Sequence, residues 1–352
     1  GKTMTLKVEK LDAAGYHGVF RGTNEETGLD AIVGVHNITL GTALGGCRIM
    51  GYESHEAHLA DALALSKAMT YKNSLAGLEI GGGKASINTH SKPVTDELLA
   101  SFAEFMNVLN QDKLIYVTTG DVGSHPEVLA EISKNTDHIW GIVGNGDSGW
   151  STAYGVYNGM LGALRHSNAT MKNKRVAVNG LGKVGARTAA FCAGAGARLV
   201  VADINRELAE KVGAELGARV VDYAEIHKES CDIYSPCALG GAVSSSTVDE
   251  LNCNIICGGA NNQLATPDMM QKLTEKGIIY VPDYLANAGG VILIGARGTD
   301  RGELEWYGPE IVGKLDYISD LTQEAIRLAE SQYAGNTARV ADMMAERRLV
   351  TY

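Results

Sequence analysis

Short apolar runs alternate with longer amphipathic stretches along the first half of the chain. The runs 31–36, 85–88 and 114–117 have the length of strands, whereas 54–70 and 95–109 repeat their apolar residues at the spacing of a helix face. Strands that alternate with helices in this way are typical of an α/β protein.

The alternation continues in the second half. Because strand–helix–strand units bring the chain back in the same direction, this pattern predicts a parallel sheet covered by helices. Long helical patterns then close the chain. The expected strands are 175–178, 198–202, 232–234, 254–256 and 278–281, and the expected helices are 183–194, 205–215, 310–330 and 336–352.

A weakly patterned, glycine-rich stretch at 140–151 separates the two halves. Glycine clusters interrupt regular structure, so this stretch predicts a hinge or a domain boundary. A length of 352 residues also fits two domains of ordinary size better than one compact core. The sequence therefore predicts an α/β protein with two domains.

The composition narrows the class of protein. Hydrophobic residues make up 45% and charged residues 20% of the chain, which is the balance of a globular protein. A formal net charge of −10 argues against nucleic-acid binding. No apolar run reaches the roughly 18 residues of a membrane span. The N-terminus, which does not begin with methionine, has no apolar signal core. We therefore expect a cytoplasmic protein without membrane contact.

The cysteines support the same compartment. They are scattered, lack the paired Cys-x-x-Cys spacing of a metal site, and in several cases lie in apolar stretches. Free thiols that pack as small hydrophobic groups are typical of a reducing compartment, and no metal site is expected. The six residues are Cys47, Cys192, Cys231, Cys237, Cys253 and Cys257.

A Gly-x-Gly-x-x-Gly motif lies between an expected strand and an expected helix. Gly180 permits a tight turn, Gly182 lets the backbone approach a pyrophosphate, and Gly185 lets the helix pack closely on the strand. Lys183 and Val184 complete the turn, and the N-terminus of the helix offers unpaired N–H groups to the phosphates. The motif predicts a dinucleotide-binding fold.

Asp203 follows this motif at the end of the next expected strand. A carboxylate there accepts hydrogen bonds from ribose hydroxyls and repels a 2′-phosphate, so the sequence favours NAD over NADP. Arg206, close behind, leaves the use of NADP open. The alternative interpretation is a glycine-rich turn with a helix-capping aspartate, but the strand–helix–strand context favours the nucleotide site.

A series of short blocks runs through nearly the whole chain. In this order, they resemble the glutamate/leucine/phenylalanine/valine dehydrogenase family, and within it the leucine dehydrogenases most closely. Several colinear blocks are far more specific than any single one. The blocks are Gly45-Gly-Cys-Arg48, Met69-Thr-Tyr-Lys72, Gly81-Gly-Gly-Lys84, Thr118-Thr-Gly-Asp121-Val-Gly123, Thr152-Ala-Tyr-Gly-Val-Tyr157, 232–240, 259–264 and 282–290.

The resemblance implies a chemical role for several of these residues. Lys72 would bind the α-carboxylate of an amino acid, with the backbone at Gly45 and Gly46 closing on the same group. Lys84 would be the catalytic base that activates water against an iminium intermediate, and Asp121 would exchange protons with the amino group. Burial and the nearby charge of Lys72 would favour the neutral form that a base requires.

The same resemblance implies a cofactor site in the second half. Thr152, Asn261 and Asn287 would hold the nicotinamide and reach towards the substrate, and Cys237 and Ala238 would lie against the cofactor. Helix capping by Thr152 and turn formation by the asparagines are the competing interpretation.

The preferred substrate is expected to be apolar. Glutamate-specific relatives carry a lysine where this chain has Leu44, and a carboxylate buried there without a partner would cost several kcal/mol. Met69, Thr119 and apolar positions of the helix at 310–330 would complete the pocket. Glycines 81–83 would let the chain approach substrate without steric conflict. A branched-chain amino acid, leucine first, is expected, and phenylalanine or another aromatic amino acid is the alternative.

The resemblance also implies the domain roles. Residues 1–140 with 330–352 would form an α/β domain for substrate binding, catalysis and oligomerisation, and 141–329 would form a Rossmann-type, doubly wound NAD-binding domain. The products would be a 2-oxo acid, ammonia and NADH. A homo-oligomer is expected, with dimer and octamer both open.

Two other functions compete with this one. A non-catalytic NAD-binding protein would require loss of the catalytic set, of which the sequence gives no sign. A 2-hydroxy-acid dehydrogenase would require a catalytic histidine with an arginine clamp, and none of the nine histidines lies in such a block.

Overall fold

The computed structural model describes residues 5–141, 148–297 and 308–350. Contacts within the chain divide these residues into two compact units. The first contains the described residues up to 141 together with 294–297 and 345–350, and the second contains 148–293 and 308–344. Each unit has its own sheet and its own hydrophobic core, which confirms the expected α/β fold of two parts.

The first unit is built on a mixed six-stranded sheet with the order β1-β2-β3-β5-β4-β6. Strands β1, β2, β3 and β5 pair antiparallel, whereas β4 pairs parallel with both β5 and β6. Its elements are β1 (Leu6–Leu11), β2 (Gly18–Asn24), β3 (Leu29–Asn37), β4 (Ala43–Met50), α1 (His55–Leu75), β5 (Gly81–Asn88), α2 (Asp96–Leu109), β6 (Tyr116–Gly120) and α3 (Pro126–Ser133).

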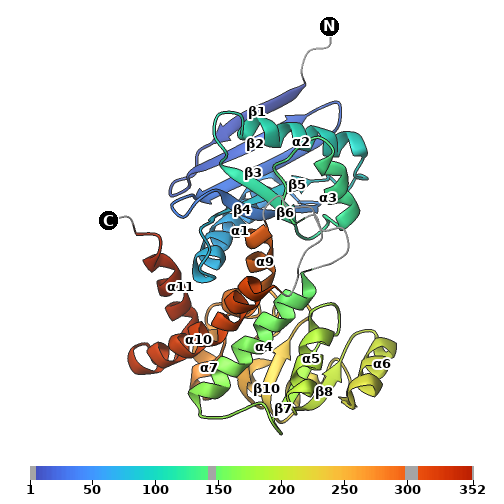
Figure 1. Cartoon of the computed structure of the whole chain (residues 1–352). Coiled ribbons are helices and arrows are strands. Elements are labelled where there is room, and N and C mark those ends of the chain that lie inside the picture. Colours follow the sequence, from blue (N-terminus) through green and yellow to red (C-terminus); the bar gives the residue numbers. More distant parts are fainter. Residues whose placement is uncertain (1–4, 142–147, 298–307, 351–352) are drawn as a thin grey trace. The chain divides into compact units, whose positions relative to one another are not determined.

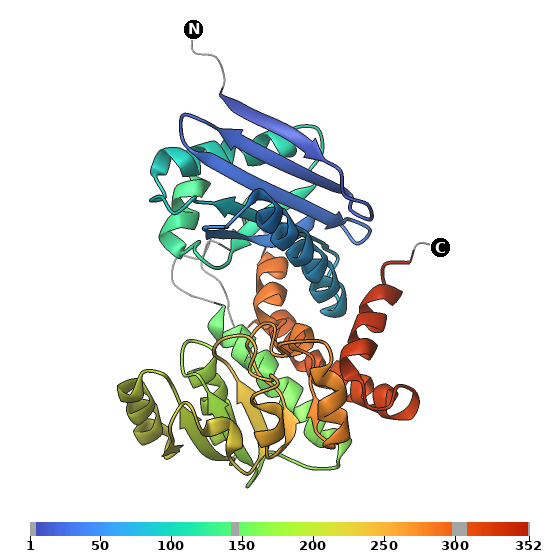
Figure 2. The same cartoon turned by 180° about the vertical axis from the view of Figure 1, so that it is seen from behind.

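Helices cover both faces of this sheet (Figures 1 and 2). Helix α1 starts at the side-chain cap of Ser54 and packs on one face, where Ser66 lies against Gly34 of β3. Helix α2 starts at the cap of Thr95 and packs on the other face, where the Phe105 ring lies against Gly22 of β2. The two capping side chains accept hydrogen bonds from the first turns, which fixes where these helices begin.

The second unit is a parallel six-stranded sheet with the order β12-β11-β10-β7-β8-β9. Its first part runs α4 (Gly149–His166), β7 (Arg175–Asn179), α5 (Gly185–Gly194), β8 (Arg198–Ala202), α6 (Arg206–Leu216), β9 (Arg219–Val220), the 3-10 turn η1 (Ile226–Lys228) and β10 (Cys231–Pro236). It continues with η2 (Val248–Glu250), β11 (Cys253–Ile256), α7 (Met269–Glu275), β12 (Ile279–Tyr280), α8 (Asp283–Ala286), α9 (Gly289–Arg297), α10 (Pro309–Gln332) and α11 (Thr337–Arg347). The ends of two of these helices, residues 294–297 of α9 and 345–347 of α11, group with the first unit.

The strand order of this sheet reverses between β7 and β10. Side chains alternate between its faces: Val176 and Val178 of β7 pack with α4 and α5, whereas Ala177 packs with α7. Figure 1 shows α4 and α5 crossing the sheet on the first of these faces. In an open parallel sheet, ligands bind outside the carboxyl ends of the strands at the point of reversal, so the fold directs attention to the ends of β7 and β10.

The division of the chain differs from the expected one near the C-terminus. Residues 330–344 group with the second unit, not with the first as expected. The reason lies in α11, where Val340 packs with Ala325 and Ala329 of α10 and the Thr337 hydroxyl donates to the Tyr280 carbonyl. Only the end of α11 returns to the first unit, where Ser74 donates to the Ala345 carbonyl.

The expected hinge at 140–151 lies partly outside the described residues, which resume at 148. Gly149, expected in an irregular stretch, begins α4. None of the helices in the described ranges combines the length and the apolar character that crossing a bilayer requires.

Candidate active site

Two expected catalytic residues of the first unit, Lys84 and Asp121, form an ion pair. The Lys84 side chain extends from β5, and Asp121 follows the last residue of β6. Their ion pair joins Lys84 Nζ to Asp121 Oδ2 at 3.0 Å, and only 6% of Lys84 is exposed. Burial raises the pKa of Asp121, but the charges of Lys84 and Arg48 together lower it by more, so the pKa lies below the ordinary value of an aspartate.

Glycines make room for this pair. A Cβ on Gly46 would lie 2.8 Å from the Cβ of Asp121, and a Cβ on Gly45 would lie 1.5 Å from the Gly83 carbonyl oxygen. The pairing of β4 with β5 is interrupted at Gly45 and Gly46, between Leu44 opposite Gly82 and Cys47 further on. The backbone of β4 at Gly45 and Gly46 therefore approaches Gly83 and Asp121 more closely than a residue with a side chain would permit.

The expected reason for glycines 81–83 was wrong. A Cβ on Gly82 would lie 2.0 Å from the Thr70 backbone nitrogen of α1, and one on Gly83 would lie 2.7 Å from the Tyr116 ring. These glycines let a helix and an aromatic ring pack against the strand, so the approach they permit is that of protein and not that of substrate. The Tyr116 hydroxyl donates to the Gly45 carbonyl at 2.6 Å and holds this arrangement together.

Lys72 lies in the last turn of α1 and is half-buried. Its neighbour Asn73 donates to the carbonyls of Leu44 and Gly81, at 3.2 and 2.8 Å, and so fixes this turn to both β4 and β5. Met69, one turn earlier, lies 3.2 Å from where a Cβ of Gly45 would be. The structure therefore brings Met69 to the Gly45 backbone and places the Lys72 turn on the strand that carries Lys84.

The two remaining pocket residues expected in this unit are buried. Leu44 is fully buried in β4, opposite Gly82 on one side and Val117 on the other. Thr119, 7% exposed, pairs with Gly46 across β4 and β6. Their assignment to the substrate pocket stays a prediction.

Arg48 is a residue of this site that sequence reasoning missed. Its Nε lies 3.2 Å from Asp121 Oδ2, the same oxygen that Lys84 contacts, and its Nη1 lies 3.4 Å from Asp61 Oδ2. Tyr52 donates its hydroxyl to Asp61 at 2.6 Å. The only signal in the sequence is the position of Arg48 at the end of the Gly45-Gly-Cys-Arg48 block.

The glycine motif of the second unit has the geometry that its spacing predicts. Gly180 has φ +95°, and a Cβ on Gly185 would lie 1.7 Å from the Gly180 carbonyl oxygen, so helix and turn need both glycines. A Cβ on Gly182 would meet nothing within 4 Å, so Gly182 faces open space. Lys183 is exposed and Val184 half-buried in the same turn. An open backbone at the start of α5 fits a pyrophosphate.

Ala238 and Cys237 lie where the two central strands end. A Cβ on Gly180 would lie 2.8 Å from the Cβ of Ala238, so the two loops are in close contact. The Cys237 backbone N–H donates to the Asn179 carbonyl at 2.7 Å. The loops after β7 and β10 therefore lie together at the point where the strand order reverses, which is where a nucleotide is expected.

The Asp203 carboxylate holds the glycine turn in place. Oδ2 accepts from the Leu181 backbone N–H at 2.7 Å, and Oδ1 accepts from the Asn205 N–H at 2.8 Å. Each oxygen keeps a further lone pair that a ribose hydroxyl could use. The competing interpretation of Asp203 as a helix cap is wrong, because Asn205 caps α6 by accepting from the Leu208 N–H. Asp203 instead stabilises the glycine turn and can also serve as a ribose acceptor. Arg206 pairs with Glu210 at 2.9 Å.

The asparagines expected at the nicotinamide form a pair. Asn287 Nδ2 donates to Asn261 Oδ1 at 2.9 Å, and Asn287 is 5% exposed. Among the described residues, Asn287 Oδ1 is buried without a hydrogen-bond partner, and such an atom can accept from the carboxamide of a nicotinamide. Thr152 lies in the first turn of α4, its Oγ1 3.1 Å from where a Cβ of Gly290 would be. The residues present fit a nicotinamide dinucleotide.

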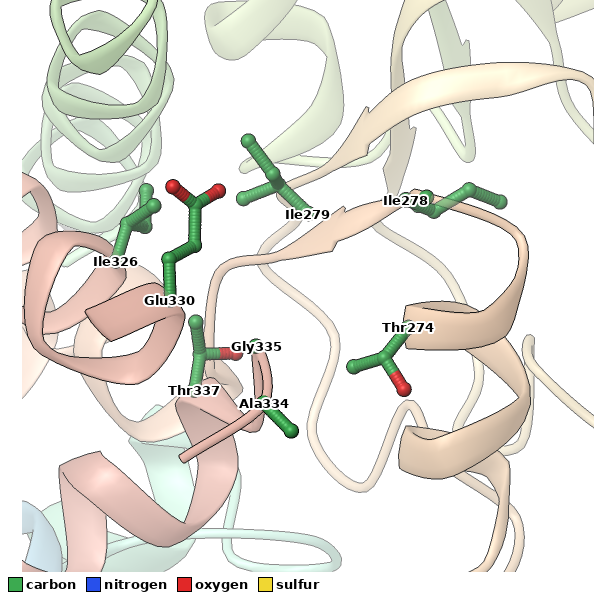
Figure 3. Close-up of a pocket in the computed structure, with 9 residues that line it drawn as sticks. Thr274, Ile278, Ile279, Ile326, Glu330, Ala334, Gly335 and Thr337 are labelled. Atoms are coloured by element: carbon green, nitrogen blue, oxygen red, sulfur yellow. The ribbon is translucent and has the colours of Figure 1, made fainter. Parts of the chain in front are cut away.

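A pocket of about 270 Å³ occupies another part of the second unit (Figure 3). It lies at the amino end of β12, beside Ile278 and Ile279, whereas the nucleotide motif lies at a carboxyl end. Ile326 and Glu330 of α10 point into it, and Glu330 accepts from His166 at 2.6 Å. None of the site residues predicted individually lines this pocket, although Ile326 belongs to the helix at 310–330 whose apolar positions were expected to face the substrate.

Comparison with known proteins gives two family matches in the order expected. Residues 19–138 match the family model of the Glu/Leu/Phe/Val dehydrogenase dimerisation domain, and 201–351 match that of glutamate/leucine/phenylalanine/valine dehydrogenase.

Individual relatives match over nearly the whole chain. Leucine dehydrogenase of Geobacillus stearothermophilus is 37% identical over 349 residues, covering 97% of this chain and 92% of its own. Phenylalanine dehydrogenase of Thermoactinomyces intermedius is 38% identical over 351 residues, covering 97% and 93%. The crystal structure of L-tryptophan dehydrogenase from Nostoc punctiforme matches with a TM-score of 0.84 at 34% identity, covering 95% of this chain and 96% of that one.

Proposed function

Since this chain belongs to the glutamate/leucine/phenylalanine/valine dehydrogenase family, we propose that it catalyses the reversible, NAD-dependent oxidative deamination of a branched-chain L-amino acid, leucine first. It is an amino-acid dehydrogenase, an oxidoreductase that acts on CH–NH2 donors. The observation that carries the proposal is the buried contact of 3.0 Å between Lys84 Nζ and Asp121 Oδ2.

In this proposal the first unit supplies the proton chemistry. Lys72 attracts the substrate α-carboxylate to the turn that Asn73 fixes on the sheet. Asp121, kept ionised by its two cations, accepts a proton from the substrate amino group. Once Asp121 has passed this proton to solvent it is again a carboxylate. Because it contacts Lys84, it can then accept a proton from the Lys84 ammonium, which frees the amine to activate water.

The second unit would hold the cofactor. When bound, NAD⁺ supplies the acceptor for the hydride of the substrate Cα. The open backbone at Gly182 would face the pyrophosphate, Asp203 the adenosine ribose, and the buried Asn287 Oδ1 the carboxamide. NAD is proposed over NADP because a 2′-phosphate would meet the Asp203 carboxylate.

An apolar substrate is proposed because Leu44 occupies the position of a carboxylate-binding lysine. Leu44 is fully buried, so a substrate carboxylate beside it would lose its hydration without gaining a partner. Phenylalanine is the second candidate, since the phenylalanine dehydrogenase relative is as similar to this chain as the leucine dehydrogenase is.

We also propose that the chain forms a homo-oligomer through its first unit. This rests on the family model that covers residues 19–138, which is named a dimerisation domain. The expectation of a cytoplasmic enzyme stays a prediction.

A substrate panel tests this proposal. The purified chain is assayed by NADH absorbance with leucine, valine, phenylalanine, tryptophan and glutamate, each with NAD⁺ and with NADP⁺. We expect the highest kcat/KM for leucine with NAD⁺. Valine should be lower by about 10- to 200-fold, because one methylene changes selectivity by that much. A preference for an aromatic amino acid, glutamate or NADP⁺ would contradict the corresponding part of the proposal.

A further inference from the structure

Two cations share one oxygen of Asp121. Lys84 Nζ lies 3.0 Å and Arg48 Nε 3.2 Å from Oδ2. The side chains of both partners of the Arg48 pair are mostly buried, with 21% and 17% exposed. A lysine that gives up its proton during turnover ceases to be a counter-ion, whereas a guanidinium keeps its charge at any pH of the assay.

The backbone fixes Arg48 relative to Asp121 from both sides. The Ser124 hydroxyl accepts a hydrogen bond from the Asp121 backbone N–H at 2.8 Å and donates one to the Cys47 carbonyl at 2.6 Å. On the other side of Arg48, the Ile49 N–H donates to the Val122 carbonyl at 2.9 Å. The turn that carries Asp121 is thus bonded to β4 immediately before and immediately after Arg48.

A second carboxylate fixes the far end of the guanidinium. Arg48 Nη1 lies 3.4 Å from Asp61 Oδ2 of α1, and the same oxygen accepts the Tyr52 hydroxyl at 2.6 Å. Tyr52 in turn is held by stacking on the buried His58, with ring centroids 4.6 Å apart, and His58 bonds to Ser86 at 2.9 Å. The guanidinium is therefore gripped at both ends, and Lys84, Arg48, Asp121 and Asp61 together carry no net charge.

On the basis of the proposed function, we propose that Arg48 is a positioning residue. It holds the Asp121 carboxyl group in place and favours the return of Asp121 to its ionised form after each proton transfer, and Asp61 and Tyr52 hold Arg48 in that position. Arg48 still places a positive charge beside Asp121 when Lys84 has released its proton. The planar fork of an arginine is required because it bridges two carboxylates, which the single ammonium of a lysine cannot do in the same geometry.

The titratable groups that face Asp121 fix the direction of the expected pH effect. Lys84 and Arg48 favour the ionised carboxylate, as stated above. Burial raises the pKa of Cys47, Tyr52 and Tyr116, so these groups stay protonated and uncharged at neutral pH. With Arg48 removed, the pKa of Asp121 rises, and the acidic limb of the kcat/KM profile moves to higher pH.

The test compares pH profiles of kcat/KM for the full-length wild type and for Arg48→Gln, Arg48→Lys, Asp61→Asn and Tyr52→Phe. Arg21→Gln is the matched control, because Arg21 makes a similar, mostly buried pair with Asp30 at 3.2 Å in the same unit. We expect Arg48→Gln to lose about 10²-fold in kcat/KM at neutral pH, as a misaimed catalytic group does, and to shift the acidic limb upwards. Arg48→Lys should restore the limb but only part of the rate, and Asp61→Asn and Tyr52→Phe should give smaller losses.

A second readout follows Asp121 without turnover. Carboxyl ¹³C NMR of aspartate-labelled protein, with Asp121→Asn to assign the signal, should show the carboxyl of Asp121 titrating at higher pH in Arg48→Gln than in wild type or Arg21→Gln. If both the acidic limb and this titration stay at their wild-type values in Arg48→Gln, the inference is wrong while the proposed function stands. If the wild type turns over none of the amino acids, the proposed function itself fails, and the NMR titration still decides whether Arg48 controls Asp121.

Discussion

At the scale of residues, the site consists of charges that compensate one another in a buried place. Lys84 and Asp121 were both predicted from the sequence, since each lies in a block that resembles the family. Arg48 was not, although it lies in such a block, because its partners Asp121 and Asp61 are 73 and 13 residues away in the chain. The pairing of Arg48 with Asp121 depends on the register of β4 against β6, and no local sequence pattern reveals it.

Asp121→Asn is expected to lower the free energy of unfolding by about 3 kcal/mol at neutral pH, because two cations then lie in a buried site without their carboxylate. The pKa of Asp121 is lower in the folded than in the unfolded chain. Its stabilising contribution is therefore complete above the unfolded value, about 4, and is lost as the pH falls through the folded value.

Urea unfolding of the wild type and Asp121→Asn at a series of pH values measures this effect. The difference between the two should be largest near neutral pH and should shrink below about pH 4. Asp112→Asn, which removes an exposed carboxylate from the same unit, is the control and should show little difference at any pH. A gap between wild type and Asp121→Asn that stays constant down to acidic pH would show that the carboxylate charge is not what stabilises the site.

At the scale of elements, the sequence predicts helices α1, α2, α5, α6, α10 and α11 and most parallel strands of the second unit, because their apolar residues form clear repeats or runs. It does not predict α3, α4, α7, α8 or α9. It misses β4, whose Ala43-Leu-Gly-Gly-Cys47 core has two glycines and no alternation. It also misses β1 and β2, and it misreads the glycines at 81–83. Whether a glycine faces substrate or another element depends on what lies beside it, and at Gly82 that neighbour is Thr70 of α1. Packing partners of this kind are fixed by the tertiary fold.

The three glycines of the nucleotide motif should respond differently to the same substitution. Gly182→Ala is expected to fold with near wild-type stability, since its Cβ meets nothing within 4 Å, but to bind NADH at least about 10-fold more weakly, because the methyl group projects where a pyrophosphate would lie. Gly185→Ala is expected to lose stability as well, because its Cβ would lie 1.7 Å from the Gly180 carbonyl oxygen.

Thermal unfolding and NADH fluorescence titration separate these outcomes. Gly194→Ala, in the last turn of the same helix with nothing near its Cβ, is the matched control and should bind NADH like the wild type. Wild-type NADH affinity in Gly182→Ala would mean that the pyrophosphate does not approach this turn.

At the scale of the whole molecule, each of the two units has its own core and carries its own part of the expected site. The described residues of the first unit stop at 141 and those of the second start at 148, on either side of the glycine-rich stretch, whereas 330–344 group by contacts with the second unit and not with the first. The sequence of an amphipathic helix such as α11 predicts that one face packs against another element. Only the fold identifies that element, which here is α10.

The central claim is that Lys84 is the base of an amino-acid dehydrogenase, and Lys84→Ala tests it most directly when compared with the exposed-lysine control Lys92→Ala. Steady-state kcat with the best amino acid and NAD⁺, together with NADH fluorescence titration, separates chemistry from cofactor binding. We predict that Lys84→Ala loses at least about 10³-fold in kcat and binds NADH as the wild type does, while Lys92→Ala keeps both. A near-normal kcat in Lys84→Ala would contradict the account.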